Sequence, residues 1–228
     1  MGMAPFSSLA QRFGTLSLAL LVVSLVAGLA YPFVGAGLAP DLNIAAKGAG
    51  VGLLALAAIA LPLQDRGWLA AIMTAGVLGD VLLAMPGLFL VGAGAFAVGH
   101  GIAISFYLRN RRIDASAAQR LLALALIGWG LAMPRLVSPP GTPVGMVMLY
   151  AVLLCGMAAA LLLSRFSRFA VVGALLFVVS DTLIVMRLGG RLVGGEWLHG
   201  LLVWLSYYLG QVLIFTGVAA GLTRRVGK

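Results

Sequence analysis

Charged residues are scarce in this chain of 228 residues: they make up 9% of it, whereas hydrophobic residues make up 62%. A soluble globular domain carries roughly a quarter charged residues, which keep its surface hydrated. The apolar residues also fall in long blocks rather than in amphipathic stripes. A helix needs about 20 apolar residues to cross a hydrocarbon layer about 30 Å thick. The composition therefore excludes a soluble domain and predicts an integral membrane protein.

Cysteine and acidic residues are also rare. The single cysteine, Cys155, excludes an intrachain disulfide, and its apolar neighbours predict a packed thiol rather than a nucleophile. Basic residues outnumber acidic ones 15 to 6. They stand in short clusters between apolar blocks, where they set topology and meet anionic headgroups, so the charge does not indicate a nucleic-acid partner. The abundance of arginine, alanine and glycine is typical of a bacterial protein from a GC-rich genome.

Eight apolar blocks predict an all-α fold, a polytopic membrane helix bundle that forms a single integral membrane domain over residues 1–228. The expected spans are residues 16–34, 44–63, 68–86, 88–108, 120–137, 144–164, 169–188 and 197–222. A tight turn at Pro86-Gly87 is expected to join the third span to the fourth.

Two of these spans are less regular than the others. The first resembles a signal peptide, with Arg12 before an apolar stretch that ends in small residues at Ala30, but we expect it to stay uncleaved. The fifth is the weakest, because Gly128, Gly130 and Pro134 interrupt it.

Loop charges predict the orientation of the chain. Eleven basic residues fall on the side of the two termini: Arg12, Arg66, Arg109, Arg111, Arg112, Arg120, Arg165, Arg168, Arg224, Arg225 and Lys228. Four fall on the other side: Lys47, Arg135, Arg187 and Arg191. The positive-inside rule therefore places both termini in the cytoplasm, with the bacterial cytoplasmic (inner) membrane as the expected location.

A short internal repeat surrounds two aspartates. Residues 79–85 read GDVLLAM and residues 180–186 read SDTLIVM, so that Asp, Leu and Met coincide. The two copies fall in spans three and seven, which point the same way through the membrane. A parallel 4+4 internal repeat, with halves at residues 1–110 and 115–228, would produce this pattern.

Several glycines are expected to let helix backbones approach each other closely, as small residues do in membrane proteins. These glycines are Gly48, Gly52, Gly92 and Gly94. A phosphate-binding loop is the alternative, but none of these runs follows a strand or completes the G-x-G-x-x-G spacing.

Asp80 and Asp181 lie inside the predicted hydrocarbon, about twelve residues, or roughly 18 Å, from the cytoplasmic start of their spans. An ionised Asp at the centre of a helix costs roughly 2.5–3.5 kcal/mol. One explanation is helix pairing by a protonated Asp. The other, which we favour, is an active-site or ion-pathway pair that faces an internal cavity.

The remaining polar residues of the spans are His100, Tyr207, Tyr208, Gln211, Asn43 and Lys47. Tyr207 and Gln211 are four residues apart and therefore share a helix face. Taken singly, His100 could be a core histidine and the tyrosines could belong to an interfacial belt, although Tyr207 lies too deep for one. His199, at the entrance of the eighth span, is expected to be a solvated surface residue.

Two other kinds of site receive little support. No G-x-S-x-G turn occurs, so a hydrolase triad is not indicated. A zinc site would need three helices to bring one His and two Asp together, and no H-x-x-x-H or C-x-x-C pair supports it. We therefore expect neither a metal nor a cofactor.

The motifs resemble those of the YhhN/TMEM86 family of eight-span membrane proteins, in the same order and over essentially the whole chain. The residues that carry the resemblance are Gly79-Asp80, Leu82-Leu83, Phe89, Gly92, Phe96, His100, the run 180–184 and Tyr207-Tyr208-x-x-Gln211. Lys47 is similar to the family's lysine at the mouth of the second span, although Gly48 replaces the usual proline. The resemblance implies lysoplasmalogenase activity, which is hydrolysis of a vinyl ether bond to a fatty aldehyde and a glycerophospho-alcohol.

For that reaction we predict acid/base catalysis by Asp80 and Asp181, as in glycoside hydrolysis. Desolvation favours the protonated form of a carboxyl group, and two close carboxyl groups cannot easily both ionise. His100 could relay protons or hold one Asp ionised. The predicted substrate contacts are Tyr207, Tyr208, Gln211, Lys47, Asn43 and Ser180, with Lys47 and Asn43 at the phosphate.

Two other functional classes stay open. A proton-coupled transporter would use the same Asp pair, and helices broken by Gly or Pro near the aspartates would favour it. A structural or assembly protein would tolerate Asn or Ala at both positions. The expected partners are a lysophospholipid and the bilayer, and the sequence does not indicate an oligomeric state.

Overall fold

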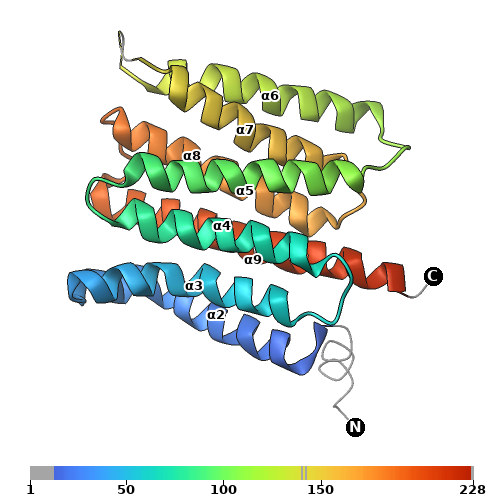
Figure 1. Ribbon diagram of the computed structural model, residues 1–228. Coiled ribbons are helices and arrows are strands. Elements are labelled where there is room, and N and C mark those ends of the chain that lie inside the picture. The colour runs from blue at the N-terminus through green and yellow to red at the C-terminus, as the bar shows by residue number, and fades with distance from the viewer. Residues whose placement is uncertain (1–12, 140, 142, 227–228) are drawn as a thin grey trace. The chain divides into compact units, whose positions relative to one another are not determined.

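The computed structural model describes residues 13–139, 141 and 143–226 (Figure 1). Over this part of the chain it contains eight α-helices, each long and apolar enough to cross a membrane. The helices are α2 (Thr15–Val34), α3 (Pro40–Ala60), α4 (Arg66–Ala84), α5 (Phe89–Arg109), α6 (Ala117–Val137), α7 (Gly145–Leu162), α8 (Arg168–Leu188) and α9 (Gly195–Val226). A short 3-10 turn, η1 (Gly35–Gly37), follows α2. The predicted all-α architecture of eight spans is confirmed.

Some residues used in the charge count lie outside the described part of the chain. Arg12 and Lys228 are among them, as are the side chains of Arg224 and Arg225. The cytoplasmic location of the termini stays a prediction.

Local sequence signals explain where two of the helices begin. Pro40 is the first residue of α3, where a missing N–H breaks no helical hydrogen bond, and Asp41 in the same turn faces the positive end of the helix dipole. The second span therefore starts four residues before the predicted residue 44. Before α6, the Gln119 N–H donates to Ser116 Oγ at 3.2 Å, and the Ser116 N–H donates to Gln119 Oε1 at 3.0 Å. This reciprocal capping box defines the start of α6.

The turn between α4 and α5 has the predicted tight geometry. The Leu88 N–H donates to the Met85 carbonyl at 3.2 Å and closes a four-residue turn. Gly87 has a φ of 76°, which a side chain would make unfavourable. Pro86-Gly87 is therefore the turn that the sequence predicted.

The helices form two compact units, which are described separately. The first contains the described residues up to Ile102 and those from Phe215 onwards, and the second contains Ala103–Ile214. Helices α5 and α9 therefore contribute residues to both units. The repeat halves 1–110 and 115–228 stay a prediction.

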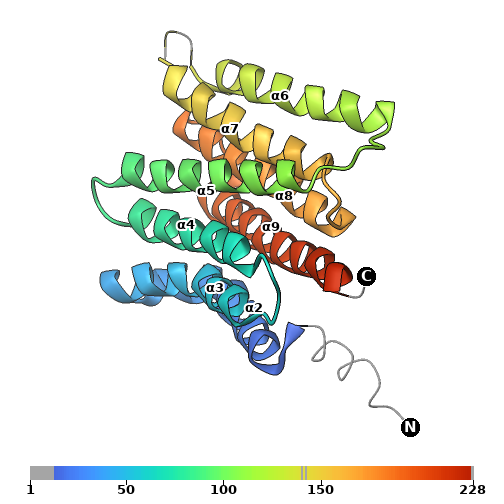
Figure 2. The same cartoon turned by 45° about the vertical axis from the view of Figure 1, so that its right-hand side comes forward.

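In the first unit, α3 packs against α2 on one side and α4 on the other (Figures 1 and 2). The Ser24 hydroxyl on α2 donates to the Gly50 carbonyl on α3 at 2.6 Å. Helices α4 and α5 approach closely at Gly92, where a Cβ atom would lie 2.7 Å from the Leu83 nitrogen. The unit is thus held by direct backbone approach and by a buried hydroxyl, both common between membrane helices.

The four glycines expected at close helix contacts divide into two groups. A Cβ atom at Gly48 would lie 2.9 Å from the Val81 side chain, and Gly92 meets backbone, so the prediction is confirmed for these two. Gly52 makes ordinary van der Waals contact at 3.9 Å, and a Cβ atom at Gly94 would meet no atom within 4 Å. The prediction is wrong for Gly94, because residue type alone does not tell which face of a helix meets its neighbour.

In the second unit, α7 packs against both α6 and α8. Helix α6 is continuous from Ala117 to Val137, so the expected interruption of the fifth span is wrong. Gly130 lies against α7, since a Cβ atom there would be 2.9 Å from the Ala151 carbonyl oxygen. Pro134 lies within α6, three residues before its end at Val137.

Helices α8 and α9 also meet backbone to backbone in this unit. A Cβ atom at Gly173 would lie 2.6 Å from the Gly210 carbonyl oxygen, and one at Gly210 would lie 2.8 Å from the Gly173 oxygen. Cys155 on α7 is buried and forms no disulfide, which confirms the predicted packed thiol.

Candidate functional site

Both intramembrane aspartates are buried. Asp80 on α4 is 2% exposed and Asp181 on α8 is 8% exposed. Each lies about 20 Å from the start of its helix at 1.5 Å per residue, so their predicted matching positions along the two helices are confirmed. Asp80 belongs to the first unit and Asp181 to the second, and their action as a pair stays a prediction.

In the first unit, Asp80 has polar neighbours on two other helices. The Lys47 ammonium on α3 and the Tyr31 hydroxyl on α2 both lie close enough to interact electrostatically with the Asp80 carboxyl group. His100, in the middle of α5, is 3% exposed, as its depth in the span predicted. Lys47 was predicted to contact a phosphate, which stays a prediction; in the structure its charge lies near the Asp80 carboxyl group.

Asn43 lies one turn before Lys47 on α3, on the shared face that the sequence predicted. Its Oδ1 atom is buried without a hydrogen-bond partner. Gly35 leaves room for it, because a Cβ atom there would be 3.1 Å from this oxygen. A buried acceptor without a donor costs about 1–3 kcal/mol, so this oxygen suits a donor group of a ligand.

In the second unit, Asp181 accepts a hydrogen bond from a residue that the sequence analysis did not select. The Tyr150 hydroxyl on α7 donates to Asp181 Oδ2 at 2.7 Å. Tyr150 lies about 8 Å from the N-terminal end of α7, and Asp181 lies about 10 Å from the C-terminal end of α8, at 1.5 Å per residue. A comparison of depths between neighbouring antiparallel spans could have identified it. The sequence analysis also missed Tyr31, which lies on α2, two helices before Asp80 on α4.

The residues next to Asp181 make contacts that hold α8 in place. The Ser180 hydroxyl donates to the Val203 carbonyl on α9 at 3.0 Å. Thr182 Oγ1 accepts a hydrogen bond from Trp129 Nε1 on α6 at 3.3 Å. Ser180 was predicted to bind substrate, and the contact observed for it is between helices; the substrate role stays a prediction.

An aromatic cluster accompanies the polar residues of α9. The Tyr207 ring meets Phe177 edge to face at 5.1 Å, and the Tyr208 ring stacks on Trp204 at 6.1 Å with planes 3° apart. Tyr207, Tyr208 and Gln211 are 6%, 0% and 3% exposed. They are therefore core residues and not members of an interfacial belt, as the depth of Tyr207 predicted.

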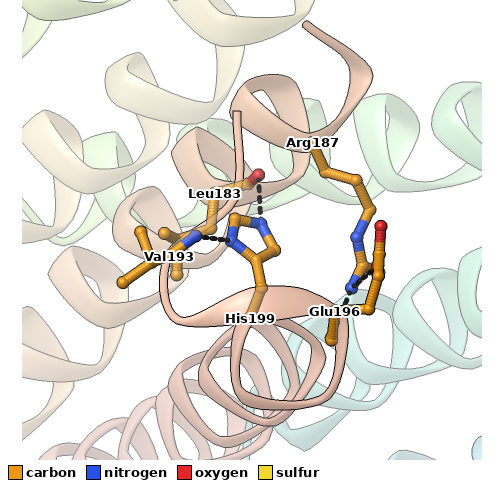
Figure 3. Close-up of polar contacts among 5 residues, drawn as sticks. All are labelled: Leu183, Arg187, Val193, Glu196 and His199. Carbon is orange, nitrogen blue, oxygen red and sulfur yellow. Dashed lines mark hydrogen bonds and ion pairs between the residues drawn. The ribbon is translucent and has the colours of Figure 1, made fainter. Parts of the chain in front are cut away.

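His199 is fully buried, so its predicted place on the solvated surface is wrong. Its Nδ1 accepts the Val193 N–H at 3.1 Å, and its Nε2 lies 2.9 Å from the Leu183 carbonyl oxygen (Figure 3). Because an N–H can only donate and a carbonyl can only accept, this ring is a neutral imidazole with its proton on Nε2. The salt bridge between Arg187 and Glu196, at 3.0 Å, lies beside it. His199, on α9, therefore links its helix to α8 and to the loop between them through two hydrogen bonds.

Among the residues that the structure describes, no group of three or more His, Cys, Asp or Glu side chains is placed to hold a metal ion. Comparisons with curated proteins and with solved structures gave no match. The model of the YhhN family matches residues 42–218, which is more than three quarters of the chain. The chain belongs to the YhhN family. The matched region of this YhhN protein contains both aspartates, His100 and the polar residues of α9. The buried polar residues therefore lie within the part of the chain that defines the family.

Proposed function

We propose that this YhhN-family protein is a membrane-embedded hydrolase that cleaves the vinyl ether bond of a lysoplasmalogen. The observation that carries the proposal is the burial of Asp80 and Asp181 in helices of a chain that belongs to this family. A carboxyl group inside hydrocarbon is costly and is therefore a default functional candidate. The substrate class, a lysoplasmalogen, is inferred from the resemblance of the motifs to those of the YhhN/TMEM86 family.

The reaction needs an acid and a base. A carboxylic acid donates its proton to the alkene carbon, which leaves an oxocarbenium ion beside the ether oxygen. Water adds to this cation and gives its extra proton to the second carboxylate. The hemiacetal then collapses, its hydroxyl proton passes to the glycerol oxygen, and the aldehyde and the alcohol separate. Asp80 and Asp181 are the carboxyl groups that we assign to these two roles.

The neighbours of the two aspartates support this assignment. Tyr150 donates to Oδ2 of Asp181, and in the described part of the chain no hydrogen bond reaches its Oδ1. Oδ1 is therefore suited to a water or to the substrate. Near Asp80, Lys47 supplies a positive charge for the lipid phosphate, and Asn43 offers the buried acceptor Oδ1 to a glycerol hydroxyl or an ammonium group.

The proton-coupled transporter receives less support. Such a protein was expected to show helices broken near its aspartates. Helices α4 and α8 are both continuous through Asp80 and Asp181.

The test is aldehyde release from a lysoplasmalogen by purified protein in detergent, without any ion gradient. Asp80→Asn and Asp181→Asn should each lower kcat by about 10²–10⁴, the usual contribution of general acid/base catalysis. Asp114→Asn, at an exposed carboxyl group in a loop, is the matched control and should keep full activity. Full activity of either intramembrane variant would refute the assignment, and transport without hydrolysis would favour the transporter.

A further inference from the structure

One end of the second unit carries six arginines on two loops and the adjoining helix ends. We call this set the arginine platform: Arg109, Arg111, Arg112, Arg120, Arg165 and Arg168. The α5–α6 and α7–α8 connections that carry it contain a single carboxylate, Asp114. The net charge of this surface is therefore strongly positive.

The two connections are joined by backbone hydrogen bonds, which fix the platform. The Arg112 N–H donates to the Leu163 carbonyl at 2.9 Å, and the Arg165 N–H donates to the Asn110 carbonyl at 2.9 Å. The Arg112 Nε also donates to the Ser164 carbonyl at 2.8 Å. Because these contacts join the loops in the folded chain, the backbone that carries the arginines does not have to be ordered by a ligand.

An aromatic cluster underlies this junction. Phe106 and Tyr107, in the last turn of α5, pack against Phe166 with ring centroids 5.3 Å and 5.7 Å apart. Asn110, which is buried, donates through Nδ2 to the Phe106 carbonyl at 2.8 Å. The loops therefore rest on a packed base rather than extending freely from the helix ends.

We propose that the arginine platform binds the headgroups of anionic phospholipids. The guanidinium groups of Arg111, Arg120, Arg165 and Arg168 belong to exposed residues, and guanidinium pairs with phosphate in bidentate geometry. The platform stands at the ends of membrane-spanning helices, which is the depth of the headgroups.

Exposed apolar side chains on the α5–α6 loop and in the first turn of α8 indicate that the anion is part of a lipid. Ile113 is 88% exposed and Phe169 is 69% exposed. Exposed apolar side chains beside basic ones fit the boundary between headgroups and acyl chains, whereas a free phosphate would leave them in water. Helices α6 and α8 also begin at this face, and their N-terminal dipoles favour negative charge.

The platform can be tested by lipid-dependent thermal unfolding of the full chain in a neutral detergent. Phosphatidylglycerol and phosphatidylcholine with the same acyl chains are added in parallel, and inorganic phosphate is added in a third arm. Phosphatidylglycerol should raise the unfolding temperature more than phosphatidylcholine does, because a ligand that binds the folded state stabilises it. Inorganic phosphate should have little effect.

The decisive variant is Arg111→Gln/Arg120→Gln/Arg168→Gln, which keeps the loop contacts of Arg112 and Arg165. Each arginine near an anionic surface contributes about five-fold in affinity, so the half-maximal concentration of phosphatidylglycerol should rise on the order of 100-fold. The single variant Arg168→Gln should show about a five-fold rise and covers the case in which the triple variant does not fold. Arg135→Gln, at the other end of α6, is the matched control and should behave as the native protein.

Three results would overturn the proposal. The first is an unchanged phosphatidylglycerol effect in the triple variant or, if that variant does not fold, in Arg168→Gln. The second is an equal response of the native protein to both lipids, which would mean that the arginines only orient the chain. The third is equal stabilisation by inorganic phosphate, which would assign the platform to free anions.

Discussion

Replacing Tyr150 by Phe removes one hydroxyl and nearly nothing else. That hydroxyl donates to Asp181 Oδ2 at 2.7 Å, and Asp181 is 8% exposed. A buried acceptor that loses its donor costs about 1–3 kcal/mol, and more if it is charged. For a chain of this length, about 2 kcal/mol corresponds to a fall of about 4–8 °C in the unfolding temperature. We therefore expect Tyr150→Phe to be clearly less stable than the native protein.

The same substitution should reduce catalysis if Asp181 belongs to the active site. Tyr150 holds one carboxylate oxygen, and a displacement of about 1 Å at a reacting group can cost about 10²-fold in rate. We expect kcat for aldehyde release to fall by about 10–100-fold with little change in KM, because the hydroxyl positions the carboxyl group rather than the lipid. Thermal unfolding and initial rates on the same preparation measure both effects.

The matched control is Tyr107→Phe. The Tyr107 hydroxyl is fully buried without a hydrogen-bond partner, so its removal takes away a desolvated polar group that receives no compensation. This variant should be as stable as the native protein or more stable. If Tyr150→Phe kept both the unfolding temperature and kcat of the native protein, the role given to this hydrogen bond would be wrong.

Three further predictions follow from packing and topology. Gly92→Ala should lower stability by about 1–3 kcal/mol, because its Cβ would lie 2.7 Å from backbone of α4. His199→Leu should lower the unfolding temperature more than Glu196→Gln, because it leaves two buried backbone groups without partners, whereas the salt bridge is largely exposed. The positive-inside rule places residue 113 on the cytoplasmic side and residue 192 on the other side of the membrane. In a chain without its native cysteine, Ile113→Cys should therefore react with an impermeant maleimide only after cells are opened, whereas Leu192→Cys should react in intact cells.

Each of these predictions has its own control. Gly94→Ala meets no atom within 4 Å and should be neutral or slightly stabilising, since alanine favours helix by about 1 kcal/mol over glycine. Equal stability of both glycine variants would contradict the packing argument. Equal unfolding temperatures of the His199 and Glu196 variants would contradict the stabilising role given to the two hydrogen bonds of the imidazole. Labelling of position 113 in intact cells would reverse the predicted orientation.

The sequence by itself determined the membrane class, the number of spans and the bounds of each span to within four residues. These follow from long apolar runs and from local signals such as Pro86-Gly87, which do not depend on distant parts of the chain. It also determined the burial of the two aspartates and of the Tyr207–Gln211 face, because a polar residue in the middle of a span has no water to reach.

Only the tertiary structure decided which side chains meet. The structure shows that Tyr150 donates to Asp181 and that His199 is buried rather than on the surface. It also shows that Gly92 lies at a close helix contact whereas Gly94 does not. Every helix in this chain is apolar on most faces, so the hydrophobic pattern does not reveal which face contacts a neighbour and which contacts lipid. The rotation of each helix about its axis is set by contacts between residues far apart in sequence. Membership of a span could therefore be predicted from the sequence, and the partners across spans could not.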